Sequence, residues 1–340
     1  MPGSVTRGRR AGWWRRRGSK RAGFRYETAD GRPVRDEEAL ERIRSLAVPP
    51  AWRDVRVSPS PRSALQAIGL DTSGRVQRIY HPSFVANRAR RKYEKTERFG
   101  ELLPALRRRT NEDIAREGLP KEKVLAVVVR LINDLYFRVG SETSVRRHRT
   151  YGVTTLRNRH LEIKPGGRLE FEFKGKHNVR HRRILVDEEL AALMRDIKAL
   201  GGARLFNYLG EDGRPRPVTP RDVNEYIKSA AAPDFSAKDF RTWGGTLLAA
   251  VALAECGRCE DEREARRRVV RAVERVAEHL GNTPTVCRGC YIHPAVIEAY
   301  LEGQTIEEFR PRRARRIARQ QPEYTPEELA LLKLLRARKK

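Results

Sequence analysis

The sequence predicts an α+β protein with a small β-rich amino-terminal domain and a mainly α-helical second domain that holds a small antiparallel sheet. Short alternating runs of polar and apolar residues, separated by turn residues, fill residues 23–98 and are typical of β-hairpins. From about Glu101 onward the apolar residues recur mostly at helical spacing. A chain of 340 residues is long enough for two such domains.

The composition is strongly basic. Lysine and arginine number 72 against 44 acidic residues, which gives a formal net charge of +28 spread along the chain. Such an excess favours nucleic acid as the partner. No stretch approaches the roughly 20 apolar residues of a membrane span, and the arginine-rich start lacks the apolar segment of a signal peptide. We therefore expect a cytoplasmic protein.

Basic extensions are predicted at both ends. Residues 1–22 are expected to form a flexible arm, in which Trp13 and Trp14 could stack on bases, although a solubilising tail explains the composition as well. Residues 309–340 are expected to form a basic tail that binds nucleic acid without sequence preference, with a short helix beginning near Thr325. Solvated disorder is compatible with both expectations.

The β-rich domain, residues 23–98, contains three strand-like runs at 54–58, 64–71 and 75–80. The last run would display Arg75, Gln77 and Tyr80, whose side chains can contact phosphates and base edges. A solvated strand face explains the same pattern equally well.

The second domain, residues 99–308, begins with a buried helix over the apolar run 124–136, so Arg138 would emerge at the end of a core helix. Runs at 151–156, 160–164, 168–174 and 179–186 then predict a small antiparallel sheet. Lys176 lies at the tip of its last hairpin, where a long flexible cation can reach into a groove.

Helices are predicted again in the rest of the domain. Thr219-Pro220 and Thr283-Pro284 are helix starts with a capping residue followed by proline, and Gly281 ends a helix over 264–280. Arg241 begins a further helical run that extends to Glu255.

Four cysteines, Cys256, Cys259, Cys287 and Cys290, form two Cys-x-x-Cys pairs. A zinc site is one interpretation. However, a helix of 15 residues from Arg241 to Glu255 would place Cys256 about 20 Å from Arg241, beyond the reach of cysteines next to Tyr291 if Tyr291 works beside Arg241. We favour two separate pairs of reduced cysteines without metal, and metal analysis distinguishes the two interpretations.

Tyr291, Arg138, Lys176 and Arg241 could converge on one phosphate. A phenol can attack a phosphodiester, but its ordinary pKa of about 10 requires neighbouring cations that stabilise the phenolate. Arginine pairs two phosphate oxygens at once, and lysine can donate a proton to the leaving oxygen. Spacing alone is weak support in so basic a chain, because a tyrosine here is more often a core or surface residue.

Five motifs resemble, in order and spacing, those of the bacterial and poxvirus type IB DNA topoisomerases. They are Phe137-Arg-Val-Gly140, Tyr151-Gly-Val-Thr-Thr-Leu156, Lys174-Gly-Lys176, Lys238-Asp-Phe-Arg-Thr-Trp-Gly244 and Gly281-Asn-Thr-Pro-Thr-Val-Cys-Arg-Gly-Cys-Tyr291. The resemblance extends from about Gly23 to Gly303. Within it, Ala47–Trp52 and Asp71–Pro82 are similar to the amino-terminal DNA-clamping domain of that family.

This resemblance implies the tyrosine recombinase/topoisomerase IB catalytic fold and a monomeric, nucleoid-associated enzyme that relaxes supercoiled double-stranded DNA. It implies that Tyr291 is the nucleophile and forms a 3′-phosphotyrosyl bond, that Arg138 and Arg241 bind the scissile phosphate, and that Lys176 protonates the leaving 5′ hydroxyl. It further implies DNA contacts by Arg75, Gln77, Tyr80 and Lys238, and neither ATP, metal nor another cofactor.

Two departures from the family pattern concern Asn282 and the strand from Arg75 to Tyr80. Asn282 stands where poxvirus enzymes have histidine, and an amide can donate a hydrogen bond but cannot carry charge. The strand reads Arg-Val-Gln-Arg-Ile-Tyr instead of Arg-Arg-Gln-Tyr-Phe-Tyr, which leaves the preferred cleavage site open.

Two other functions stay open as alternatives. A tyrosine recombinase shares the nucleophile chemistry, but usually has His-x-x-Arg where this chain has Lys238 to Arg241. A non-enzymatic nucleoid protein accounts for the charge but not for the ordered motifs.

Overall fold

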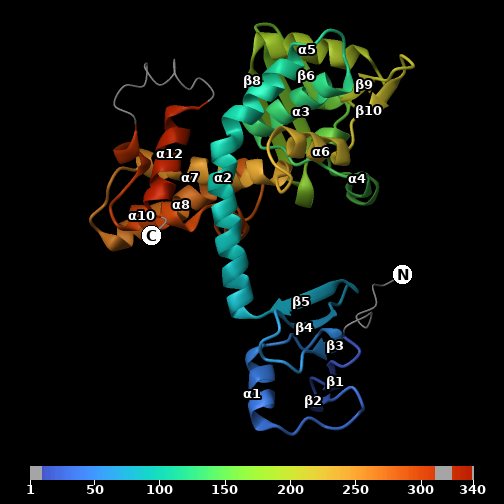
Figure 1. The fold of residues 1–340 in the computed structure, drawn as a ribbon, viewed down its shortest axis with the longest axis vertical. Helices are drawn as coiled ribbons and strands as arrows, with labels where there is room; N and C mark the ends of the chain where they lie inside the picture. Colours follow the sequence, from blue (N-terminus) through green and yellow to red (C-terminus); the bar gives the residue numbers. More distant parts are fainter. Residues whose placement is uncertain (1–9, 311–323, 339–340) are drawn as a thin grey trace. The chain divides into compact units, whose positions relative to one another are not determined.

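The computed structural model describes residues 10–310 and 324–338. The chain divides into two compact units, residues 1–92 and 93–340, so that the boundary falls inside helix α2 (Pro82–Ile114) rather than between residues 98 and 99 as predicted. Figure 1 shows both units, and each is described separately below. The predicted α+β fold class is confirmed.

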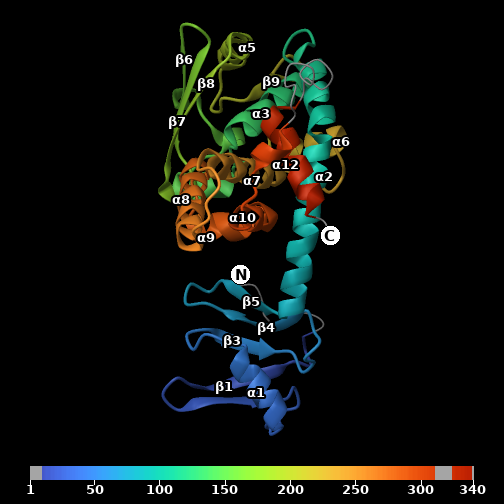
Figure 2. The same ribbon diagram turned by 90° about the vertical axis from the view of Figure 1, so that its left-hand side faces the viewer.

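The first unit is built on a five-stranded antiparallel sheet in the order β2-β1-β3-β4-β5, whose strands are labelled in Figure 1 and, apart from β2, in Figure 2. The three predicted strands are present as β3 (Arg53–Val57), β4 (Leu65–Leu70) and β5 (Val76–Tyr80). Helix α1 (Glu37–Ser45) contributes Ile43 to a small core that also contains Val55, Val57 and Ala67.

The prediction of a flexible arm over residues 1–22 is wrong for Trp14–Ser19, which form strand β1. β1 pairs with β2 (Gly23–Glu27) across a tight turn and also with β3, which is distant in sequence. Arg16 supports this arrangement, because its guanidinium lies 4.1 Å from the ring centroid of Phe24 and donates a 2.6 Å hydrogen bond to the carbonyl of Trp52. Residues 1–9 of the predicted arm lie outside the described residues.

The second unit is mainly helical and shares one hydrophobic core, in which helices α3 and α7 are extensively buried. Thr219 and Thr283 cap α6 and α9 as predicted, and Gly281 ends α8 with a left-handed φ of 60°. The helices of the described part after α2 are α3 (Lys121–Leu135), α4 (Glu142–His148), α5 (Glu188–Ala199), α6 (Pro220–Ala230), α7 (Ala237–Glu255), α8 (Glu262–Leu280), α9 (Pro284–Cys290), α10 (Pro294–Leu301) and α12 (Pro326–Ala337), with short 3-10 turns η1 (Val153–Thr155), η2 (Asn158–His160), η3 (Lys176–Asn178) and η4 (Ile306–Phe309).

The small sheet of this unit has three strands in the order β6-β7-β8, namely β6 (Leu161–Lys164), β7 (Arg168–Lys174) and β8 (Arg180–Val186). The predicted strand at 151–156 is not formed. This segment instead contains the turn η1 and bonds to the segment that follows α3, with the Val153 amide donating to the Arg138 carbonyl at 2.8 Å. The short hairpin of β9 (Asn207–Leu209) and β10 (Pro215–Pro217) was not predicted.

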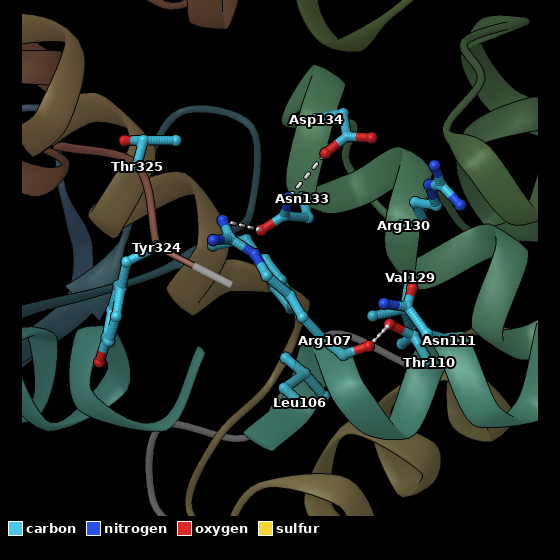
Figure 3. Close-up of a pocket in the computed structure, with 11 residues that line it drawn as sticks. Leu106, Arg107, Thr110, Asn111, Val129, Arg130, Asn133, Asp134, Tyr324 and Thr325 are labelled. Atoms are coloured by element: carbon cyan, nitrogen blue, oxygen red, sulfur yellow. Dashed lines mark hydrogen bonds between the residues drawn. The ribbon is translucent and has the colours of Figure 1, made fainter. Parts of the chain in front are cut away.

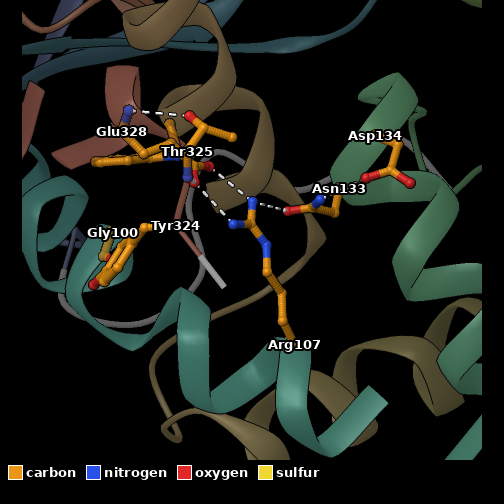
Figure 4. Close-up of polar contacts among 8 residues, drawn as sticks. Gly100, Arg107, Asn133, Asp134, Tyr324, Thr325 and Glu328 are labelled. Carbon is orange, nitrogen blue, oxygen red and sulfur yellow. Dashed lines mark hydrogen bonds and ion pairs between the residues drawn. The ribbon is translucent and has the colours of Figure 1, made fainter. Parts of the chain in front are cut away.

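The carboxy-terminal end is not only a basic tail, because α12 packs into the core of the second unit. Its leucines at helical spacing, including Leu331 and Leu335, are buried. Glu328 accepts two hydrogen bonds from Arg107, at 2.7 and 2.8 Å (Figure 4). It also accepts one from the indole of Trp243 at 3.4 Å. Most of the arginine-rich segment, residues 311–323, lies outside the described residues.

None of the helices in the described part of the chain combines the length and the apolar character that crossing a bilayer requires.

Candidate active site

Five segments of the second unit, one of them α6 with Asn224, meet around a cavity of about 360 Å³. Arg138 follows α3, Lys176 lies between β7 and β8, Arg241 lies in α7, and Tyr291 follows α9. The structure therefore brings together the four residues that were predicted from the sequence to converge on one phosphate. The other residues that line the cavity are Val139, Asn224, Ser236, Ala237 and Lys238.

Tyr291 is held from both sides through its backbone. Its amide donates to the Cys287 carbonyl at 2.9 Å, which ends α9, and its carbonyl accepts a 3.3 Å hydrogen bond from the Thr246 hydroxyl on α7. A Cβ atom at Gly245 would lie 2.7 Å from the Tyr291 carbonyl oxygen, so only glycine allows α7 to approach this closely. These contacts fix the Tyr291 backbone beside α7, and its side chain is half-buried.

Arg241 is the most buried of the cations around the cavity, with an exposed fraction of 4%. One terminal nitrogen donates to the Tyr136 carbonyl at 2.6 Å and the other to the Leu280 carbonyl at 2.8 Å. Its guanidinium carbon lies 5.1 Å from the ring centroid of Tyr291. Burial lowers the pKa of Arg241 from its ordinary value, an effect that Tyr291 opposes.

Arg138 approaches the same site from the end of α3. It donates to the Gly281 carbonyl at 3.0 Å and to the Asn282 side-chain oxygen. Burial, followed by the positive charge of Arg241, lowers the pKa of Arg138 to about 10. Two guanidinium groups are thus partly desolvated side by side, and a bound phosphate would relieve this repulsion.

Asn282 follows Gly281, the residue that ends α8. Its side-chain oxygen accepts from Arg138, which directs its amide nitrogen elsewhere. That nitrogen, Nδ2, is buried and has no hydrogen-bond partner in the described part of the chain. The Asn282 side chain also lies close enough to Cys287 to oppose the rise in the pKa of that thiol. Donation from Asn282 to a phosphate stays a prediction.

Lys176 begins the turn η3 at the tip of the β7–β8 hairpin and is exposed. His177 and Asn178 have positive φ values of 62° and 61°, which turn the chain sharply enough to return it to β8. The Gly175 amide donates to the Val179 carbonyl at 2.8 Å and closes the tip. The hairpin thus carries a solvated cation to the rim of the cavity.

The amino-terminal end of α7 forms another wall of the cavity. Ser236 caps this helix together with Asp239, and Lys238 lies in its first turn. Amide groups at a helix start attract anions. Sequence analysis named Lys238 but missed Ser236 and Asn224, although the Ser236-x-x-Asp239 capping pattern was visible in the sequence.

The DNA contacts predicted in the first unit lie on or beside β5. Gln77 donates to an Asp71 carboxylate oxygen at 2.9 Å, and Arg75 lies 3.8 Å from the same oxygen. Tyr80 stacks on Phe84 with ring centroids 5.3 Å apart. Asp71 therefore holds both Arg75 and Gln77 in place.

The cysteines occupy unlike environments. Cys287 is fully buried and burial raises the pKa of its thiol, whereas Cys256 and Cys290 are exposed. The helix that was expected to separate Cys256 from Arg241 is present, since α7 is continuous from Ala237 to Glu255. Among residues 10–310 and 324–338, no group of three or more histidine, cysteine or acidic side chains is arranged to hold a metal ion.

A second cavity of the same unit, about 410 Å³ in volume, is lined by residues of α2, α3 and the start of α12 (Figure 3). Its two arginines bind other side chains of the protein. Arg107 contacts Glu328 and Asn133, and Arg130 donates to Asp187 at 2.6 Å. This cavity supports the attachment of α12, whereas the cavity at Tyr291 brings a phenol and several cations together.

Known proteins match this chain over most of its length. The family model for the catalytic core of eukaryotic DNA topoisomerase I matches residues 81–316, and that for the amino-terminal domain of bacterial DNA topoisomerase IB matches residues 23–71. The DNA topoisomerase 1B of Acanthamoeba polyphaga mimivirus is 30% identical over 284 residues, which cover 82% of this chain and 84% of the viral protein. That of Vaccinia virus (strain Copenhagen) is 24% identical over 277 residues, covering 78% and 83%.

The catalytic-core match covers more than half of the chain and includes every segment that meets at the cavity. The amino-terminal match covers most of the five-stranded sheet of the first unit. The chain therefore belongs to the type IB DNA topoisomerases, a family of isomerases.

Proposed function

We propose that this enzyme relaxes supercoiled double-stranded DNA by cutting one strand through Tyr291, letting the cut strand swivel, and resealing it. The observation that carries the proposal is the convergence of Tyr291, Arg138, Arg241 and Lys176 on a single cavity. A nucleophile, two phosphate-binding cations and a proton donor are the groups that a phosphodiester transfer needs.

In the cleavage step the Tyr291 hydroxyl gives its proton to solvent water and its oxygen forms a bond to phosphorus, while the bond from phosphorus to the 5′ oxygen breaks. Arg138 and Arg241 neutralise the non-bridging oxygens, and the Asn282 amide donates a further hydrogen bond. Lys176 protonates the departing 5′ oxygen. The product is a 3′-phosphotyrosyl linkage and a free 5′ hydroxyl.

Resealing reverses these steps after the strand has rotated. One phosphoester replaces another in each direction, so the bond energy is conserved and ATP is not needed. The cations of the protein provide the charge neutralisation that a metal ion supplies in other phosphoryl-transfer enzymes. Torsional strain in the DNA sets the direction of rotation.

DNA contacts outside the cavity are expected to bind the sugar-phosphate backbone of the DNA, because a rotating duplex must be held without a fixed base register. We propose Arg75, Gln77 and Tyr80 as such contacts in the first unit. In the second unit we propose Lys238, at the wall of the cavity, as a further DNA contact. We further propose that the enzyme acts as a monomer in association with the nucleoid.

The proposal is tested by relaxation of a supercoiled plasmid in the presence of EDTA and without ATP. The wild-type enzyme is expected to relax the plasmid under these conditions, and Tyr291→Phe to bind DNA with unchanged affinity but neither nick nor relax it. Relaxation by Tyr291→Phe, or wild-type activity only after a metal is added, would overturn the proposal. Strand exchange between two specific sites would indicate a recombinase instead.

A further inference from the structure

The His181 side chain lies between two backbone segments of the candidate active site. It comes from β8, is 7% exposed, and stacks on Phe173 of β7 with ring centroids 5.2 Å apart and an interplanar angle of 27°. Stacking holds the ring in one plane, and its far edge is directed at Gly175 and Gly281.

Both glycines contact that edge closely. A Cβ atom added at Gly175 would lie 2.4 Å from Cδ2 and Nε2 of His181, and one added at Gly281 would lie 2.4 Å from Cε1. Gly175 has an ordinary φ of −91°, so contact with the ring, rather than backbone conformation, is what excludes a larger residue there. The imidazole thus fills the space between the hairpin tip and the turn after α8.

The two glycines immediately precede Lys176 and Asn282. Asn282 is bonded to Arg138, so the turn after Gly281 belongs to the phosphate-binding side of the cavity. Lys176 is exposed on the hairpin tip, directly after Gly175. One ring therefore links the position of the expected proton donor to the position of the expected phosphate ligands.

The ring is also uncharged at neutral pH. Burial, and then the positive charges of Arg183, Arg138 and Arg241, lower the pKa of His181 to about 4. A neutral ring adds no further cation to the phosphate site. The ring acts by filling the space between the hairpin tip and the turn after α8.

We propose that His181 is a positioning residue that sets the distance between Lys176 and the scissile phosphate. The inference rests on the proposed function, since it assigns His181 to the proton-donation step of that reaction. Removal of the ring lets the hairpin tip move relative to Arg138 and Asn282. A displacement of about 1 Å at a reacting group can slow a reaction by roughly 100-fold.

The first test measures single-turnover cleavage by His181→Ala on two substrates, one with the natural 5′ oxygen and one with a bridging 5′ sulfur that needs no proton to leave. We expect cleavage of the oxygen substrate to slow by roughly 10- to 100-fold and most of this loss to disappear with sulfur. Unchanged cleavage of the oxygen substrate, or an equal loss on both substrates, would overturn the inference.

His160→Ala is the matched control, because His160 is also a buried imidazole of this unit, 8% exposed, and also neighbours Phe173. It meets Tyr151 edge-on and is not among the atoms that a Cβ at either glycine would meet. His160→Ala should lower thermal stability without a defect that sulfur corrects. Lys176→Ala is measured alongside. If sulfur fails to rescue Lys176→Ala, the proposed proton donor is wrong. If sulfur rescues Lys176→Ala but not His181→Ala, only the positioning inference fails.

The second test is a double-mutant cycle with Gly175→Ala. The added methyl should press on the His181 ring and slow cleavage of the oxygen substrate by at least 10-fold in the otherwise wild-type enzyme. In the His181→Ala background the same methyl has room, so it should cause little further loss. Independent, multiplicative effects of the two substitutions would contradict the contact on which the inference depends.

Discussion

The Arg241 guanidinium lies beside the face of the Tyr291 ring, with 5.1 Å between its central carbon and the ring centroid. Both terminal nitrogens are engaged by backbone carbonyls, those of Tyr136 and Leu280. These bonds fix the plane of the guanidinium before DNA arrives. Preorganised charge of this kind stabilises a transition state without reorganisation during the reaction.

We expect Arg241→Lys to be nearly as inactive as Arg241→Ala. An ammonium group keeps the charge, but it cannot bond both carbonyls and present a planar donor pair to phosphate. Cleavage should slow by roughly 100- to 1,000-fold in both variants, measured as single-turnover formation of the covalent complex. A lysine variant with wild-type cleavage would show that charge alone suffices and that the planar geometry has no role.

Asn282 offers a sharper test of a single donor. Asn282→Asp preserves an oxygen that can accept from Arg138, but it replaces the buried Nδ2 donor with a second oxygen. We expect Asn282→Asp to cleave at least as slowly as Asn282→Ala, with both roughly 100-fold below wild type. Full activity of the aspartate variant would exclude donation by Nδ2 to the phosphate.

Glu328 should anchor the carboxy-terminal helix to the rest of the second unit. Glu328→Ala leaves Arg107 without its carboxylate partner in a largely buried position, so the free energy of unfolding should fall by about 3 kcal/mol. Chemical denaturation measures this change. Glu225→Ala is the control, because its ion pair with Arg221 is exposed, and the midpoint of unfolding should not move. Equal stability of the two variants would contradict the anchoring role.

Stability should fall on acidification through the titration of buried histidines. Burial lowers the pKa values of His160 and His181 from 6.5 to about 4, so between these values the unfolded chain binds protons that the folded protein does not. The free energy of unfolding should therefore decrease as the pH falls from 6.5 toward 4, by at most about 1.4 kcal/mol per pH unit for each histidine. Denaturation across this range should show a shallower slope for His160→Ala, and an unchanged slope would contradict the assignment.

Local patterns in the sequence accounted for much of the fold. The strands β3 to β5 and the β7–β8 hairpin pair with neighbours in the chain. The alternation of polar and apolar residues and the turn residues between the strands were therefore sufficient to predict them. β1 was missed because its arginines suggested a solvated arm, although its hairpin with β2 is local; only its pairing with β3 is long-range. The segment 151–156 has the composition of a strand, but its backbone bonds to Arg138 and Val139 instead, which no local signal reveals.

The candidate site was predictable in part for a similar reason. Side chains that carry chemistry, such as Tyr291 and Lys176, are recognisable from residue type and motif. The groups that hold them are not, because the carbonyls of Tyr136 and Leu280 belong to any residue and act only through their position. His181 was missed although it follows Lys176 closely in sequence, since only the packed structure places its ring against both glycines.

The most direct measurement is to trap the complex with denaturant during the reaction and identify both the modified residue and the DNA end attached to it. We predict a peptide that contains Tyr291 joined through its phenol oxygen to a 3′ phosphate, with a free 5′ hydroxyl on the other side of the break. A linkage through another residue, a linkage to the 5′ end, or DNA relaxation without any covalent complex would contradict the account.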